Sequence, residues 1–309
     1  MKKLIIVLLS LVMAVSLSAC SGGSEAEPEE GSEQTVAESV FTGNYVVSAD
    51  YVKENLDNIL LYDARGEEAA AEGTIAQAVP VAWQYFATCE DGATGDANWG
   101  CILDPERLSA RLGEKGFDKD KEIVIFAAAD QGWGDDGRIA WELIAAGYTN
   151  VKIVDGGYNA LVAAGLETSN GGAEPVPVEV TIESIDQTHV INTDELVSDY
   201  DQYKIVDARA DEEYNGEVLY GESKGGHLPG AIHIPFGSLF DENGMLKSNE
   251  ELTAIFEEAG LEKDDKIVTY CTAGIRSAFM QLIMEDCGYG NVKNYDESFY
   301  RWSAVQDVE

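Results

Sequence analysis

The sequence contains one pattern twice, and this repetition constrains the fold more than any other feature. Residues 61–65, Leu-Tyr-Asp-Ala-Arg, recur 144 residues later at 205–209 as Ile-Val-Asp-Ala-Arg. Residues 147–152, Gly-Tyr-Thr-Asn-Val-Lys, recur 141 residues later at 288–293 as Gly-Tyr-Gly-Asn-Val-Lys. Self-similarity at a nearly constant offset indicates a duplicated domain. A stretch with glycines and prolines at 169–177 separates the copies and is typical of a linker.

Within each copy, short apolar segments alternate with amphipathic ones. This alternation predicts an α/β fold in which each copy has a mainly parallel sheet flanked by helices. We therefore expect one domain at 45–168, a linker at 169–188 and a second domain at 189–309. In the second copy the pattern predicts strands at 204–206, 231–234, 267–270 and 292–295, and helices at 252–259 and 278–286.

A cysteine follows the predicted strand 267–270 and stands before a helix. In open α/β sheets, sites form at the carboxyl ends of strands. The helix N-terminus favours a thiolate over a thiol, and Arg276 adds a positive charge. Gly274 permits a positive φ and a close approach of the backbone. The loop from Cys271 to Arg276 is thus predicted to be an anion cradle around a nucleophile. The alternative is a small packed side chain, which is common for a cysteine beside a buried strand.

The N-terminus is typical of an exported protein. Two lysines precede an uncharged apolar run, and we interpret residues 1–19 as a signal peptide that is too short for a membrane span. Residues 17–20, Leu-Ser-Ala-Cys, resemble the bacterial lipobox, in which the cysteine, here Cys20, is acylated and becomes the mature N-terminus. Ordinary signal cleavage near Ala19 is the alternative. Residues 20–44 are acidic and poor in apolar side chains, which predicts a flexible tether.

Charge and cysteine content narrow the function further. The formal net charge of −37 argues against nucleic-acid binding and against electrostatic attachment to anionic lipid. Three histidines in the whole chain argue against a zinc site, and we expect neither a metal nor a cofactor. Cys89 and Cys101 flank a Gly- and Asp-rich stretch. In an exported protein they predict a loop-closing disulfide, with two free thiols or a metal pair as the alternatives.

Three segments of the second copy resemble the rhodanese family of sulfurtransferases. Asp207-Ala208-Arg209 is similar to the family's Asp-x-Arg after the first core strand, and residues 226–231 are similar to its Gly-His-Ile-Pro-Gly-Ala segment. Residues 270–277 resemble the active loop. The first copy keeps Asp63-Ala64-Arg65 but has no cysteine in the corresponding loop, 127–138. The resemblance implies two tandem rhodanese-like domains, of which the first is inactive and helps to shape the site of the second.

The resemblance also implies roles for individual residues. Cys271 is expected to take a sulfane sulfur from a donor as a persulfide and to pass it to a thiophilic acceptor. Backbone N–H groups of the loop are expected to hold the donor, while Arg276 clamps its negative charge. The residues expected to bind substrate are Thr272, Ala273, Gly274, Ile275 and Arg276. The residue types themselves favour a bracing role near the site for Asp207, Arg209 and His227. The alternatives are an acid pair at Asp207 and Arg209 and a general base at His227.

Two positions depart from the thiosulfate-specific two-domain members, which carry basic residues there. They are Ala273 in the loop and Glu213 after Asp-x-Arg. These departures weaken the expectation of thiosulfate as the donor but not that of sulfur transfer. The donor is expected to be a small sulfur-containing anion, namely a thiosulfate-like compound, a polysulfide or mercaptopyruvate. Cyanide or a thiol is the expected acceptor.

Two other functions fit part of the pattern. One is a non-enzymatic surface sulfur carrier or binding module. The other is a cysteine-based phosphatase or arsenate reductase, which generally has five residues between cysteine and arginine where this chain has four. In every case we expect a monomer on the extracytoplasmic side of a bacterial cell membrane. Its membrane contact would be the lipid anchor at Cys20 alone, and nucleic acid is not an expected partner.

Overall fold

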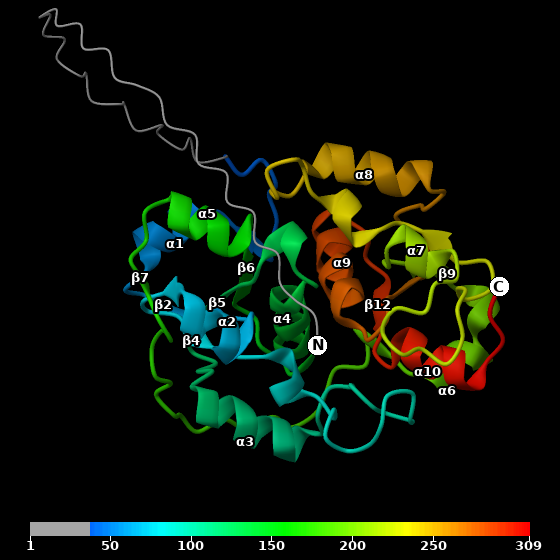
Figure 1. The fold of residues 1–309 in the computed structure, drawn as a ribbon, viewed down its shortest axis with the longest axis horizontal. Coiled ribbons are helices and arrows are strands. Elements are labelled where there is room, and N and C mark those ends of the chain that lie inside the picture. The colour runs from blue at the N-terminus through cyan, green and yellow to red at the C-terminus, as the bar shows by residue number, and fades with distance from the viewer. Residues whose placement is uncertain (1–37) are drawn as a thin grey trace, which may run out of the picture. The chain divides into compact units, whose positions relative to one another are not determined.

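Two parallel sheets with the same strand order form the centre of the computed structural model, which describes residues 38–309 (Figure 1). The first sheet has the order β1 (Val46–Val47), β6 (Val151–Val154), β5 (Glu122–Phe126), β2 (Ile59–Asp63) and β4 (Val79–Pro80). The second has the order β8 (Val190–Ile191), β12 (Val292–Tyr295), β11 (Ile267–Tyr270), β9 (Lys204–Asp207) and β10 (Ile232–His233). Every neighbouring pair in both sheets is parallel. The expectation of an α/β fold with two duplicated parallel sheets is confirmed.

Helices make the crossovers between the strands. The first copy contains α1 (Ala49–Asn55), α2 (Gly66–Glu72), α3 (Pro105–Lys115), α4 (Asp135–Ala145) and α5 (Gly157–Ala163), with 3-10 turns η1 (Trp83–Phe86) and η2 (Ala129–Gln131). It also has a short antiparallel pair of β3 (Thr74–Ile75) and β7 (Thr168–Ser169). The second copy contains α6 (Thr193–Ser198), α7 (Asp211–Tyr214), α8 (Asn249–Glu258), α9 (Ile275–Asp286) and α10 (Ser298–Val305), with η3 (Tyr200–Gln202) and η4 (Phe236–Leu239).

Local sequence signals set the ends of the surface helices. In α3, the side chain of Asp104 accepts hydrogen bonds from the first-turn N–H groups, and Pro105 opens the helix where its missing N–H has no cost. Gly116 ends α3 in the left-handed conformation, with φ 80°. In α8, Ser248 and Glu251 form a reciprocal capping box. These caps fix where each helix begins or ends.

The two copies meet through α4 and α9, which lie side by side (Figure 1). Nearly all residues of both helices are buried, as expected for helices that are covered on all sides. A Cβ atom added to Gly137 of α4 would lie 2.5 Å from the Cβ of Phe279 on α9, so only glycine allows this approach. One core cluster of buried side chains runs across the interface. The two copies therefore share one hydrophobic core and are not independently packed domains joined by a linker.

Most predicted elements of the second copy are confirmed, and one boundary matters for function. The strands at 267–270 and 292–295 have the predicted bounds. The helix predicted from residue 278 begins at Ile275 instead. Gly274 caps it with φ 78°, and Arg276 is buried in its first turn. The charged side chain interrupts the apolar pattern, which is why the pattern placed the start too late.

The predicted tether was wrong for residues 38–44, which pack against the folded chain. Phe41 is buried, and the backbone N–H of Thr42 donates to Asn249 Oδ1 at 2.9 Å. The N–H of Asn44 donates to Asp286 Oδ1 at 2.6 Å. Burial of Phe41 and these backbone hydrogen bonds together anchor the stretch, and neither can be seen in its composition. The predicted signal peptide at 1–19, the lipidation site Cys20 and the rest of the tether lie outside the described residues. Within 38–309, no helix has the length and apolar character to cross a membrane.

Candidate active site

Cys271 lies at the carboxyl end of β11, the central strand of the second sheet, and is 1% exposed. The start of α10 holds its backbone. The N–H of Cys271 donates to Ser298 Oγ at 2.9 Å, and its carbonyl accepts from the N–H of Phe299 at 3.1 Å. Ser298 has φ 54°, a left-handed conformation that is uncommon for a residue with a side chain. Backbone strain of this kind clusters at functional sites, and here it orients the group that fixes the cysteine.

The surroundings of the thiol favour its ionised form. Burial alone would raise the pKa of Cys271, but the positive charge of Arg276 and hydrogen bonds from Ser277 and the backbone of Ala273 bring that pKa below its usual value. Ser277 Oγ lies 3.6 Å from Cys271 Sγ and 2.7 Å from Asn294 Oδ1, so its single proton can serve one of them at a time. The thiolate therefore depends mainly on Arg276 and on the backbone at the start of α9.

Arg276 is already paired with a carboxylate. Its Nη1 and Nη2 atoms donate to the two oxygens of Glu213 on α7, at 2.7 and 2.8 Å. Thr272 Oγ1 donates to Glu213 Oε1 at 2.5 Å and accepts from Arg276 at 2.9 Å. All three side chains are buried. This arrangement differs from the expectation that the guanidinium would be free to clamp an anionic donor, because both of its Nη atoms already donate to Glu213.

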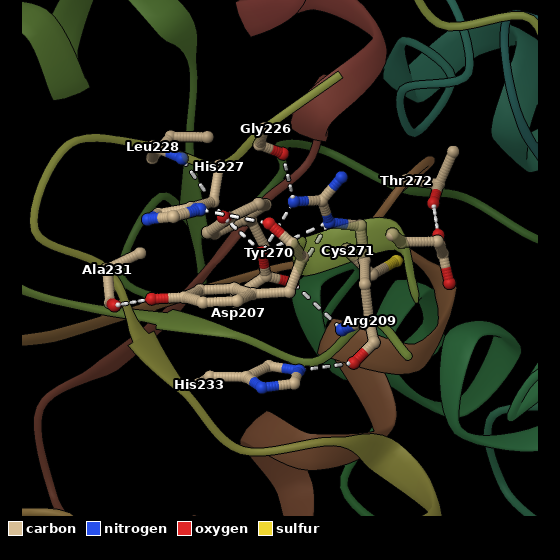
Figure 2. A network of polar contacts seen from close by, with 12 residues as sticks. Asp207, Arg209, Gly226, His227, Leu228, Ala231, His233, Tyr270, Cys271 and Thr272 are labelled. Atoms are coloured by element: carbon tan, nitrogen blue, oxygen red, sulfur yellow. Dashed lines mark hydrogen bonds and ion pairs between the residues drawn. The ribbon is translucent and has the colours of Figure 1, made fainter. Parts of the chain in front are cut away.

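Asp207 and Arg209 form a fully buried ion pair behind the loop (Figure 2). Arg209 Nη2 donates to Asp207 Oδ2 at 2.7 Å and to the carbonyl of Gly226 at 2.8 Å. The hydroxyl of Tyr270, the residue before Cys271, donates to the same carboxylate oxygen. The pair thus ties β9 and the 226 loop to the strand that ends at Cys271.

His227 is engaged in a stack of rings. It packs on Tyr214 with a centroid distance of 3.9 Å, and His233 packs on Tyr214 at 4.2 Å. The Nδ1 atom of His227 lies 3.0 Å from the carbonyl oxygen of Tyr214. His227 therefore belongs to the network around Asp207 and has no contact with the sulfur of Cys271.

A pocket of about 250 Å³ opens onto the cysteine, and both copies supply its wall. The first copy contributes Trp83, Trp99, Trp133 and Asp135, and the second contributes Tyr220 and Tyr300 beside the loop. None of these aromatic residues belongs to the site predicted from the sequence. Only Trp133 could have been linked to the site from the sequence, because it stands in the loop of the first copy that corresponds to the Cys271 loop.

Ala127 occupies in the first copy the position of Cys271 in the second. It follows the central strand β5, and its carbonyl accepts a hydrogen bond from the N–H of Tyr158, as that of Cys271 does from Phe299. Arg65 pairs with Asp63 and donates to the carbonyl of Gly73, which repeats the Arg209 contacts. The first copy thus keeps the frame of the site without its sulfur.

Comparison with known proteins agrees with this architecture. The family described as Rhodanese-like domain matches residues 48–164 and again residues 192–305. The chain belongs to the rhodanese family. Each match falls within one of the two copies, so this is a tandem rhodanese.

Relatives of similar length carry names from sulfur metabolism. A protein of Mycobacterium leprae, provisionally named a thiosulfate sulfurtransferase, is 26% identical over 85% of this rhodanese and 96% of its own length. The sulfur carrier protein TtuD of Thermus thermophilus is 27% identical, and the match covers 85% of this chain and 95% of TtuD. A solved structure is also similar, that of SseA from Escherichia coli, which is described as a 3-mercaptopyruvate sulfotransferase with the rhodanese fold. It superimposes with a TM-score of 0.71 and 25% sequence identity, and the match covers 82% of this chain and 98% of SseA.

The disulfide predicted between Cys89 and Cys101 is absent from this rhodanese, in which both cysteines are free thiols. The N–H of Thr88 donates to the carbonyl of Cys101 at 2.8 Å, so Thr88 and not Cys89 stands across from Cys101. Burial raises the pKa of Cys89 to about 11 and that of Cys101 well above its usual value, so neither is an activated thiol. Within residues 38–309, no group of His, Cys, Asp or Glu side chains is placed to hold a metal ion.

Proposed function

We propose that this protein is a sulfurtransferase in which Cys271 carries the transferred sulfur as a persulfide. The observation that carries the proposal is the contrast between the copies: the same backbone frame holds a buried thiol with a lowered pKa at Cys271 and a methyl group at Ala127. A lowered thiol pKa at a strand end beside a helix N-terminus is what a nucleophilic sulfur requires. The names of its relatives support sulfur transfer at the level of the family.

The transfer would proceed in two displacements. Cys271 Sγ⁻ attacks the outer sulfur of the donor and forms an S–S bond. The bond that joined this sulfur to the donor breaks, and its electron pair leaves with the remainder, which is sulfite from thiosulfate or the pyruvate enolate from mercaptopyruvate. An acceptor such as cyanide or a thiolate then attacks the terminal sulfur of the persulfide. The electron pair of the S–S bond returns to Cys271 Sγ, so the cycle needs no external oxidant or reductant.

Backbone N–H groups would hold the charge that develops during these steps. The N–H groups of Ala273 and Ser277 act directly on the sulfur of Cys271. They belong to the loop and the first turn of α9, where N–H groups lack partners within the helix. A persulfide anion extending from Sγ would stay close to the same donors. Thr272 and Arg276, by contrast, are occupied with Glu213 and would act on the substrate through the shape of the loop.

Exposure of the purified protein to thiosulfate, polysulfide and mercaptopyruvate should add the mass of one sulfur atom to Cys271 with at least one donor. Cyanide should remove that mass, and the Cys271→Ala variant should lose turnover by roughly a thousandfold or more, as expected for loss of a nucleophile. Cys287→Ala is the matched control, because this buried cysteine lies in the same copy and should leave turnover unchanged. If all three donors leave Cys271 unmodified, the proposal is wrong. A persulfide that forms without steady-state turnover would support a sulfur carrier instead.

We also propose that acyl chains on Cys20 hold the mature protein at the extracytoplasmic face of a bacterial cell membrane. The support is the lipobox-like sequence Leu-Ser-Ala-Cys after an uncharged apolar run, followed by an acidic segment. Mass spectrometry of the mature protein should find residue 20 at the N-terminus with the added mass of acyl chains. Cys20→Ala should move the protein from the membrane to the soluble fraction. A mature chain that begins elsewhere and lacks acyl groups would contradict this assignment.

A further inference from the structure

Aromatic rings dominate the pocket that holds Cys271, and they are arranged as edge-to-face pairs. Trp99 and Tyr300 have centroids 5.5 Å apart with an interplanar angle of 84°. Trp133 and Tyr220 are 5.2 Å apart at 89°. Each pair joins a ring from the first copy to one from the second, and Trp83 adds a fifth ring. In an edge-to-face pair the rim of one ring meets the face of the other, and only a face that is not covered in this way presents the negative part of its quadrupole to a ligand. Arginines already lie near two of the rings, Arg276 at 4.8 Å from the centroid of Trp133 and Arg138 at 5.3 Å from that of Trp83.

The positive charges near this pocket are neutralised. Arg276 is paired with Glu213, and its guanidinium lies 4.8 Å from the centroid of the Trp133 ring. Arg138 of α4 is fully buried between Glu142 and Asp296. No unpaired cation from residues 38–309 lines the pocket. An anionic donor would therefore find little direct charge compensation from side chains here.

Negative groups, by contrast, are left without ion pairs within the described part of the chain. Asp135 lines the pocket, and burial raises its pKa to about 6, so it is mostly ionised at neutral pH. Glu222 is buried; one oxygen accepts from the N–H of Tyr220, and the other oxygen has no hydrogen-bond partner among the described residues. The pKa of Tyr300 is raised to about 12 by burial first and by Glu222 next, which places this carboxylate within electrostatic reach of the pocket. The thiolate of Cys271 adds a further negative charge.

We propose that the pocket binds a substrate with a compact organic cation, above all a quaternary ammonium group. The cationic group would lie among the aromatic rings, and the atom that exchanges sulfur would face Cys271. Such a group needs no hydrogen bonds and is attracted both to ring faces and to carboxylates. The pocket volume of about 250 Å³ is at the small end for ligand sites and fits a compact molecule. This inference names the substrate class for the sulfur transfer proposed above, and it rests on that proposal only for the chemical step.

In that step, the cationic substrate would act as the acceptor. Its thiolate attacks the terminal sulfur of the Cys271 persulfide, and the S–S bond to Sγ breaks. The electron pair returns to Sγ, and the acceptor leaves as its own persulfide. Charge and electrons balance without a further reactant. The positive group of the acceptor also offsets the repulsion between its thiolate and the persulfide anion.

Binding of choline tests the cation site separately from the chemistry. In the full-length Cys271→Ser protein, which cannot form a persulfide, we expect choline to bind at least about tenfold more tightly than 3,3-dimethylbutan-1-ol, its uncharged carbon isostere, when both are measured by calorimetry. Tenfold corresponds to about 1.4 kcal/mol. Equal binding of the two compounds, or no binding of choline, would overturn the inference.

Two substitutions locate the site. Trp133→Leu and Asp135→Asn, each in the Cys271→Ser background, should each weaken choline binding by about fivefold or more and leave the isostere nearly unaffected. Glu54→Gln is the matched control, because it makes the same change in charge on the exposed face of α1, away from the pocket. Urea unfolding of each variant checks that the fold is retained. If Trp133→Leu does not fold, Asp135→Asn still tests the site, because it preserves the side-chain volume. Choline binding that is insensitive to both substitutions would also contradict the proposal.

The turnover of the wild-type persulfide separates the two proposals. Thiocholine should accept sulfur with a kcat/KM at least about tenfold above that of 3-mercaptopropionate, an anionic thiol. Preference for the anionic thiol would overturn the cation inference while supporting sulfur transfer. If no persulfide forms, the proposed function fails, and the choline measurements still decide whether the cation site exists.

Discussion

Replacing Glu213 by alanine is expected to lower the free energy of unfolding by about 3–5 kcal/mol, the usual range for breaking a buried ion pair. The substitution would leave the guanidinium of Arg276 buried without its carboxylate partner. It would also remove the acceptor of the Thr272 hydroxyl. Urea unfolding monitored by tryptophan fluorescence measures the change. A loss below about 1 kcal/mol would contradict the buried pair.

Two controls separate the ion pair from general effects on α7. Glu212→Ala changes the neighbouring exposed residue of the same helix and should stay within about 0.5 kcal/mol of wild type. Glu213→Gln keeps the shape and should cost less than Glu213→Ala. The pKa of Glu213 is lowered: burial alone would raise it, but Arg276 outweighs that effect. Because the folded-state pKa lies below the unfolded one, the stability from this carboxylate is present above the unfolded pKa and is lost as the pH falls through the folded pKa.

The same substitution should change the reactivity of the thiol. Glu213 offsets the positive field of Arg276, and that field lowers the pKa of Cys271. Without the carboxylate, the pKa of Cys271 should fall further, so alkylation by iodoacetamide should reach half of its maximal rate at a lower pH. The freed guanidinium should also lower the KM for thiosulfate. An unchanged alkylation profile would show that Arg276 does not act on the sulfur.

The sequence was sufficient to predict the duplicated fold because the signals are local and strong. The segment 267–270 is a nearly continuous apolar run, as expected for a parallel strand that is buried on both faces. The predicted bounds of this strand and of the strand at 292–295 match β11 and β12. The loop after β11 could be recognised since Cys271, Gly274 and Arg276 stand in one segment. Each of these features can be recognised without knowing what packs against it.

Contacts between distant segments account for what the sequence did not predict. Trp133 and Tyr220 are far apart in the chain and meet only when α4 packs against α9. The pairing of Arg276 with Glu213 likewise depends on α7 lying beside the active loop. Buried Phe41 and hydrogen bonds from Thr42 and Asn44 hold residues 38–44 against the folded chain. In each case a tertiary contact overrode a pattern that was read locally.

Arg138 illustrates how one such contact reaches the active loop from the other copy. This fully buried residue of α4 donates from Nη1 to Asp296 at 2.6 Å and to the carbonyl of Gly274 at 3.1 Å, and from Nε to Glu142 at 2.8 Å. A Cβ atom on Gly274 would lie 2.8 Å from Arg138 Nη1, so the loop and the guanidinium fit closely. The first copy thereby positions the loop that carries Cys271.

Arg138→Met is therefore expected to reduce the free energy of unfolding by about 3–5 kcal/mol and also to reduce sulfur transfer. The substitution leaves Glu142 and Asp296 buried without their cation. The matched control is Arg111→Met on α3, whose guanidinium is partly exposed and lies 3.6 Å from Glu90; this change should cost about 1 kcal/mol or less. Adding Glu142→Gln and Asp296→Asn to Arg138→Met removes the two unpaired carboxylates. If these changes restore much of the stability but not the turnover, Arg138 acts on the loop as well as on the carboxylates.

The pH dependence of that variant gives a second, independent test. Burial raises the pKa of Glu142 to about 7, even though Arg138 lowers it, and removal of Arg138 should raise that pKa further. A carboxyl whose folded-state pKa lies above its unfolded value favours the folded protein at low pH, and this advantage is lost as the pH rises through the folded pKa. The stability deficit of Arg138→Met relative to wild type should thus shrink between pH 8 and about pH 6. A deficit that stays constant over this range would mean that the ionised Glu142 carboxylate is not the source of the loss.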